Sequence, residues 1–139
     1  MSMNTTTHLN FRGEALAALE FYKSVFGGEL TAFTYEQAQN VQDPADAERI
    51  MWGQVAAPSG FRVMAYDVPA AMPWEQGENA FFVSVRSDDA DEISGCWEGL
   101  AVDATIRRPL GPAAWAPLYG MLQDRFGVVW VMDVGIEQR

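Results

Sequence analysis

The C-terminal stretch 119–134 constrains the fold of this chain more than any other part of the sequence. It opens with alternating positions, which place Tyr119, Met121 and Gln123 on one face of a strand. The next four residues, DRFG, are typical of a tight turn in which Gly127 is free to adopt a positive φ. A run rich in Val, Trp and Met follows and predicts a strand buried on at least one face. The chain is therefore predicted to end in a β-hairpin.

Composition limits the class of protein. The chain has 139 residues, of which 49% are hydrophobic, and this suits one domain or two small fused modules with a packed core. The formal net charge of −10 argues against binding to nucleic acids or to anionic membranes, because both require a basic surface. The charge is compatible with cationic or neutral small ligands, and solubility alone also explains it.

Cysteine content and the absence of targeting signals indicate the compartment. The single cysteine, Cys96, excludes an intramolecular disulfide, and we expect it to fill the core from a helix face. The sequence shows neither a charged-then-apolar leader nor an apolar run of membrane-spanning length. A cytoplasmic protein is therefore expected.

The first half of the chain predicts one helix among four strands. The helix opens at Glu14, whose charge suits the positive end of the helix dipole, and it stops at the Gly27-Gly28 pair. The polar segment 36–49 is long for a loop, so it either covers a site or carries a short helical turn. The expected strands are Thr7–Phe11, Glu29–Tyr35, Ile50–Ala56 and Phe61–Asp67.

The second half repeats this order after a linker at residues 68–78, which holds two prolines and shows no periodicity. We expect a strand at Asn79–Val85 and a helix capped by Ser87 that ends near Leu100. A strand at Ala104–Arg108 and a Pro-rich loop at Pro109–Pro117 then lead into the closing hairpin.

An internal repeat connects the two halves. Sliding the sequence by 74 residues aligns apolar positions in both copies, namely Phe11 with Val85, Leu16 with Ala90, Leu19 with Ile93, Tyr22 with Cys96, Phe26 with Leu100 and Leu30 with Ala104. We therefore predict an α+β fold of two βαβββ modules, residues 1–67 and 79–139, whose curved sheets form a bowl. Such modules leave apolar surface open, so they are expected to pair within one chain or between two.

Two motifs carry a family resemblance. The segments FYKSVFGGEL at Phe21–Leu30 and YGMLQDRFGVVWVMDV at the end of the chain resemble the vicinal-oxygen-chelate superfamily. Within it the chain is most similar to the PhnB-like group of glyoxalase/bleomycin-resistance-type proteins, which is also labelled 3-demethylubiquinone 3-methyltransferase-like. Trp115 also resembles a tryptophan of that group. The resemblance covers residues 7–134 and implies a homodimer.

The resemblance implies a metal site that this chain matches only in part. Metal-dependent members hold a divalent ion with His, Glu or Gln from four strands, with open positions at which a substrate chelates. His8, or Thr6 or Thr7 in a shifted register, lies near the first ligand position. Trp52 replaces a frequent histidine, with Gln54 two residues on, and Val131 replaces a glutamate. The candidate ligands are therefore His8 and Gln54, with Asp67 or Asp133 as a carboxylate.

Aromatic residues predict a ligand pocket. Side chains of this kind on a concave sheet line apolar pockets with a few polar handles, although core and dimer packing also use them. The aromatic and methionine candidates are Trp52, Met64, Tyr66, Trp74, Trp115 and Trp130. Trp130 is compatible with facing a helix instead, and Arg62 lies either inside the bowl or in solvent. The predicted ligand-binding residues are His8, Trp52, Gln54, Arg62, Tyr66 and Trp115.

The sequence is compatible with three functions. The first is small-molecule binding in an acidic, aromatic-lined groove without turnover. The second is a divalent-metal-dependent lyase, isomerase or dioxygenase with a degenerate ligand set, and the third is a partner-binding scaffold. A Ser-His-Asp triad and a glycine-rich phosphate loop are both missing from the sequence. S-adenosylmethionine use is discounted because Gly27-Gly28 follows a helix instead of preceding one.

Overall fold

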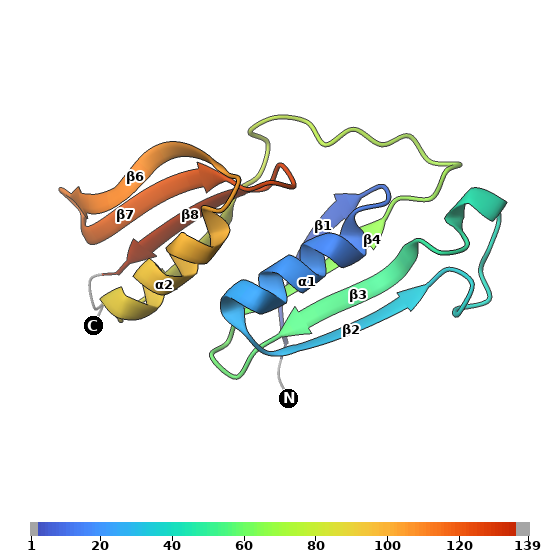
Figure 1. Ribbon diagram of the computed structural model, residues 1–139, viewed down its shortest axis with the longest axis horizontal. Coiled ribbons are helices and arrows are strands. Elements are labelled where there is room, and N and C mark those ends of the chain that lie inside the picture. Colours follow the sequence, from blue (N-terminus) through green and yellow to red (C-terminus); the bar gives the residue numbers. More distant parts are fainter. Residues whose placement is uncertain (1–2, 136–139) are drawn as a thin grey trace. The chain divides into compact units, whose positions relative to one another are not determined.

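The computed structural model describes residues 3–135 and divides the chain into two compact units, Met1–Gln76 and Gly77–Arg139 (Figure 1). The division falls inside the predicted linker at residues 68–78. Each unit contains one α-helix and one four-stranded mixed sheet, so the predicted α+β class is confirmed. Neither α-helix of the described residues has the length and apolar content needed to cross a membrane.

Unit 1 follows the predicted order closely. Its elements are β1 (Thr7–Phe11), α1 (Ala15–Phe26), β2 (Glu29–Thr34), the short 3-10 helix η1 (Pro44–Asp46), β3 (Ile50–Ala56) and β4 (Arg62–Asp67). The strand order in the sheet is β1-β4-β3-β2, in which β1 runs parallel to β4 and the other pairs are antiparallel. The predicted helical turn in the long polar segment is therefore present as η1.

The helix α1 covers one face of this sheet (Figure 1). It buries Ala15, Ala18, Leu19 and Tyr22, and it lies so close to β3 that a Cβ atom at Gly53 would collide with Leu19. The position of Gly53 on a central strand is thus explained by close helix–sheet packing. The pair Gly27-Gly28 ends the helix, as the sequence predicts, and φ is positive at both residues.

Unit 2 has the same arrangement. Its elements are β5 (Val83–Ser87), α2 (Ala90–Leu100), β6 (Thr105–Ala113), β7 (Ala116–Gln123) and β8 (Val129–Val134), with sheet order β5-β8-β7-β6. The predicted C-terminal hairpin is the β7–β8 pair, and Gly127 in its turn has a φ of 88°. Trp130, Met132 and Leu122 are fully buried in its core.

The predicted Pro-rich loop is wrong. Strand β6 continues through Pro109 and Pro112, and β7 begins at Ala116, so only two residues separate the strands. Proline is tolerated because β6 is the edge strand of its sheet, where an N–H group is not needed by a further neighbour. The β6–β7 register also shifts at three places, which relieves the pairing around the prolines.

The start of unit 2 also differs from the prediction. Strand β5 begins at Val83 instead of Asn79, whose φ of 60° is incompatible with a strand, and it extends to Ser87. The N-cap of α2 is Asp89, which accepts hydrogen bonds from the N–H groups of Asp91 and Glu92. The predicted cap, Ser87, instead accepts from the Asp89 N–H and donates to Glu92. The predicted core residue Cys96 is only half-buried, and burial raises the pKa of its thiol.

Candidate functional site

The sheet of unit 1 has a second face, opposite α1, that the core does not use. Burial alternates along β4, with Val63, Ala65 and Asp67 buried toward the helix and the residues between them more exposed. We name the opposite side face A. According to the strand register it comprises His8, Asn10, Glu29, Thr31, Phe33, Trp52, Gln54, Ala56, Arg62, Met64 and Tyr66.

A row of registered residues crosses the centre of face A. His8 pairs with Met64 on β4, and Met64 pairs with Gln54 on β3. The His8 ring meets the edge of Tyr66, with ring centroids 5.0 Å apart, and its Nδ1 lies 2.9 Å from Oδ1 of Asn10. The sheet therefore places an imidazole, a phenol and an amide beside one another.

A second ring pair lies on strands β2 and β3. Trp52 is directly opposite Phe33, and their ring centroids are 5.9 Å apart. Phe33 is 49% exposed although it is a large apolar side chain. Phe33 is not among the predicted ligand-binding residues, although strand alternation from Leu30 indicates that it faces away from α1.

Five of the predicted ligand-binding residues thus share face A. Trp52, Gln54 and Tyr66 are half-buried, and His8 and Arg62 are exposed. The sixth, Trp115, belongs to unit 2. The predicted acidic character is not found here, because Glu29 is the one carboxylate among the described residues of face A and it is offset by Arg62 on the same side.

The predicted carboxylate ligand Asp67 does not share face A with His8 and Gln54. Asp67 lies on the α1 side, where it accepts hydrogen bonds from the N–H groups of Gly13 at 2.6 Å, Ala15 at 3.1 Å and Ile50 at 2.9 Å. It caps α1 from a distant strand, whereas Glu14, expected to open the helix, makes no side-chain cap.

The other candidate carboxylate, Asp133, forms an ion pair. Asp133 in unit 2 accepts two hydrogen bonds from Arg86, at 3.1 Å and 2.9 Å, and this bidentate contact raises the pKa of Arg86. No group of three or more His, Cys, Asp or Glu side chains in residues 3–135 is placed to hold a metal ion. Since catalytic metal sites generally use three protein ligands, the two donors His8 and Gln54 do not fit one by themselves.

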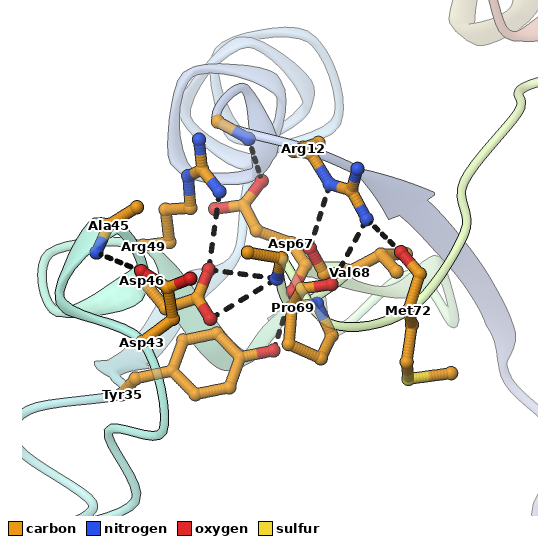
Figure 2. Close-up of polar contacts among 12 residues, drawn as sticks. Arg12, Tyr35, Asp43, Ala45, Asp46, Arg49, Asp67, Val68, Pro69 and Met72 are labelled. Atoms are coloured by element: carbon orange, nitrogen blue, oxygen red, sulfur yellow. Dashed lines mark hydrogen bonds and ion pairs between the residues drawn. The ribbon is translucent and has the colours of Figure 1, made fainter.

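A buried polar network lies beside β4 and was not predicted (Figure 2). Asp46 in η1 accepts hydrogen bonds from the Ala70 N–H at 3.1 Å and 3.2 Å and from Arg49 at 3.2 Å. The Tyr35 hydroxyl donates to the carbonyl of Asp67 at 2.6 Å. Burial, together with the nearby Tyr66 and carboxylates, raises the pKa of Tyr35 to about 12. This network holds the chain after β4 in place, so its role is to stabilise the fold.

The remaining tryptophans differ in role. Trp130 is fully buried on the α2 side and donates from Nε1 to Asp124 at 2.8 Å, so it belongs to the core. Trp74 lies in the segment that joins β4 to β5, and it donates to the carbonyl of Asn10 at 3.2 Å. Trp115 is 54% exposed and contacts Tyr119 and Arg108, a combination that the sequence analysis did not identify.

Comparisons with known proteins agree with this architecture. The crystal structure of protein PA1353 from Pseudomonas aeruginosa is 31% identical, with a TM-score of 0.83, over 98% of this chain and 100% of that one. The PhnB protein from Bacillus cereus is 24% identical with a TM-score of 0.75, over 96% of this chain and 100% of that one. Protein YjdN from Escherichia coli K12 is 24% identical over 98% of both chains.

A more distant likeness concerns the fold alone. A glyoxylase/bleomycin resistance protein/dioxygenase domain from Frankia is 12% identical with a TM-score of 0.67, over 98% of this chain and 99% of that one.

The family model described as 3-demethylubiquinone-9 3-methyltransferase matches residues 3–132 of the present sequence. The chain therefore belongs to this family, which includes PhnB, and has the fold of the glyoxalase/bleomycin-resistance proteins.

Proposed function

We propose that this protein binds a small organic molecule on face A, without a complete metal site. The observation that carries the proposal is the grouping of two ring pairs, His8 with Tyr66 and Trp52 with Phe33, on the sheet face that α1 leaves unused. Aromatic side chains with a few convergent polar groups are the usual lining of small-molecule sites.

Each residue has a distinct role in this proposal. Trp52 and Tyr66 provide flat apolar contact, and Phe33 extends it. Gln54 and His8 supply hydrogen-bond donors and acceptors near the centre, and both lie beside Met64, whose flexible side chain adapts to ligand shape. Since Arg62 and Glu29 offset each other, a neutral, planar molecule suits the face better than a cation.

Methyl transfer is not part of the proposal, although the family name contains it. A nucleotide-type cofactor site needs a glycine-rich loop that runs from a strand into a helix N-terminus. Here Gly27-Gly28 follows α1 and leads into β2. The homodimer implied by the family resemblance and the cytoplasmic location both stay predictions, of which the first is checked by sedimentation velocity.

A neutral fluorescent probe tests the proposal directly. N-phenyl-1-naphthylamine is aromatic, apolar and uncharged, so its fluorescence is expected to rise when face A binds it. We expect saturable binding to the unmodified protein, and at least about fivefold weaker binding to Trp52→Ala and Tyr66→Ala, because each loses a ring contact.

The matched control is Phe81→Ala. Phe81 is 92% exposed and belongs to unit 2, so its removal deletes an exposed ring outside face A. The control is expected to bind the probe like the unmodified protein. Equal binding by Trp52→Ala and the unmodified protein would contradict the assignment to face A. Thermal midpoints of all variants show whether a loss of binding reflects unfolding.

A further inference from the structure

We propose that Arg108 in unit 2 binds the carboxylate of a planar organic acid. The site consists of Arg108, Trp115 and Tyr119. It lies on the sheet of unit 2, and it does not depend on the function proposed for face A.

A β-bulge positions Arg108. Ile106 pairs with Leu122 and Arg108 pairs with Met121, so Arg107 is an extra residue on β6. Bulges of this kind redirect side chains at sheet edges. Arg107 and Arg108 are consecutive residues on the bulged strand, and their surroundings differ.

The guanidinium of Arg107 already has hydrogen-bond partners. Its guanidinium donates to Asn79 at 2.6 Å and to Gln123 at 3.0 Å, and it lies 5.8 Å from the centre of the Phe82 ring. These contacts hold the segment before β5 against the sheet. Arg107 is therefore structural and serves as an internal comparison for its neighbour.

The Arg108 guanidinium contacts two aromatic rings. Its Cζ atom is 5.2 Å from the ring centre of Trp115 and 5.1 Å from that of Tyr119, and these two rings meet edge-on at 5.1 Å. Among residues 3–135, no residue accepts a hydrogen bond from the Arg108 guanidinium. Cation–π contact orients a guanidinium without using its N–H donors. The planar fork of N–H groups that can donate two parallel hydrogen bonds to a carboxylate therefore stays available.

The surrounding charges favour an anion at this position. Tyr119 pairs across the sheet with Asp133, which would repel an anion if it were alone. The bidentate contact with Arg86 at 2.9 Å offsets the charge of Asp133, so Arg108 contributes the uncompensated charge of the cluster. The overall charge of −10 opposes anions at long range, but salt screens exposed charges beyond about 10 Å at 0.1 M ionic strength.

The shape of the cluster favours a carboxylate on a flat molecule. Trp115 is 54% exposed, so a ligand ring can stack on it while its carboxylate receives two parallel hydrogen bonds from Arg108. A tetrahedral phosphate fits the fork but gains nothing from the exposed ring. Aromatic acids are therefore expected to bind more tightly than inorganic phosphate.

Titration with benzoate, followed by the indole ¹H–¹⁵N signals of the full chain, tests the proposal. The Trp115 signal is assigned by its loss in Trp115→Phe. We expect benzoate to shift this signal saturably, and benzamide, which is isosteric and neutral, to shift it much less. Arg108→Gln is expected to weaken benzoate binding about tenfold or more, because hydrogen bonds to charged groups are lost.

Two further variants separate the fork from the charge. Arg108→Lys keeps the charge but loses the planar fork, so we expect intermediate affinity. Arg125→Gln removes an equal charge from the turn before β8 and should bind benzoate normally. The proposal is overturned if benzoate does not shift Trp115, if benzamide binds equally, or if Arg108→Gln keeps full affinity. The neutral naphthylamine probe on face A reports separately on the first proposal.

Discussion

Tyr35 shows how burial changes the chemistry of a single residue. Its side chain is 4% exposed, and its hydroxyl donates to the backbone carbonyl of Asp67 at 2.6 Å (Figure 2). Removal from water is the main cause that raises the pKa of Tyr35 to about 12, and negative charge on Tyr66, Asp46 or Asp67 adds to it. The neutral phenol is thus part of the folded structure.

This raised pKa predicts loss of stability at alkaline pH. The unfolded chain releases the tyrosine proton near pH 10, whereas the folded chain holds it until about pH 12. The unfolded state therefore binds fewer protons in this interval, and the free energy of unfolding falls as pH rises from 10 to 12. Urea unfolding at pH 9 and pH 11.5 measures the fall, which Tyr35→Phe should reduce.

A second tyrosine provides the control for this measurement. Tyr119→Phe removes a hydroxyl from the unit 2 sheet and should leave the alkaline fall unchanged. Tyr35→Phe also loses one hydrogen bond, which costs about 1 kcal/mol at every pH and does not affect the slope. An equal fall in the unmodified protein and in Tyr35→Phe would show that another group causes it.

At the scale of elements, the segment that joins β4 to β5 is fixed at both ends. Arg12, just after β1, donates to the carbonyls of Val68 at 3.2 Å, of Pro69 at 3.0 Å and of Met72 (Figure 2). Trp74 then donates to the carbonyl of Asn10, and on the other side Arg107 holds Asn79. Residues 75–78 lie between these anchors.

Removal of Arg12 is expected to loosen this segment. Arg12→Ala loses three hydrogen bonds to backbone carbonyls, so residues 68–74 should open more often and chymotrypsin should cut after Trp74 about tenfold faster. Mass spectrometry of the early fragments identifies the cut. Arg125→Ala, an arginine change in the other unit, is the matched control. Unchanged cleavage after Trp74 in Arg12→Ala would refute the anchoring role.

The elements also show what the sequence could predict and why the rest was missed. Strands β1 and β3 have the predicted bounds, because turn residues follow both of them, Gly13 after β1 and Pro58 to Gly60 after β3. The C-terminal part of strand β6 was not predicted, because prolines disfavour central strands. That β6 is an edge strand, where proline is tolerated, is known only from the tertiary structure. The Arg108 cluster depends on a bulge, whose register shift no local pattern reveals.

At the scale of the whole molecule, the predicted repeat is confirmed as topology. In both units the sheet order is first, fourth, third, second strand, with the helix after the first strand. The units differ in how each helix starts, because α1 is capped by Asp67 from the end of β4 and α2 by Asp89 at its own N-cap. The repeated fold is thus maintained by different local contacts.

At this scale we also expect the whole protein to lack a stoichiometrically bound metal ion. Face A offers only His8 and Gln54 of the candidate ligands, so we expect well below one equivalent of metal per chain after purification without a His-tag. Added Ni²⁺, Zn²⁺, Mn²⁺ or Fe²⁺, or EDTA, should leave the thermal midpoint unchanged, since a metal bound only to the folded state would raise it. His8→Ala is the control for specificity. Near one equivalent of metal, lost in His8→Ala, together with an EDTA-lowered midpoint would favour the metal-dependent enzyme instead.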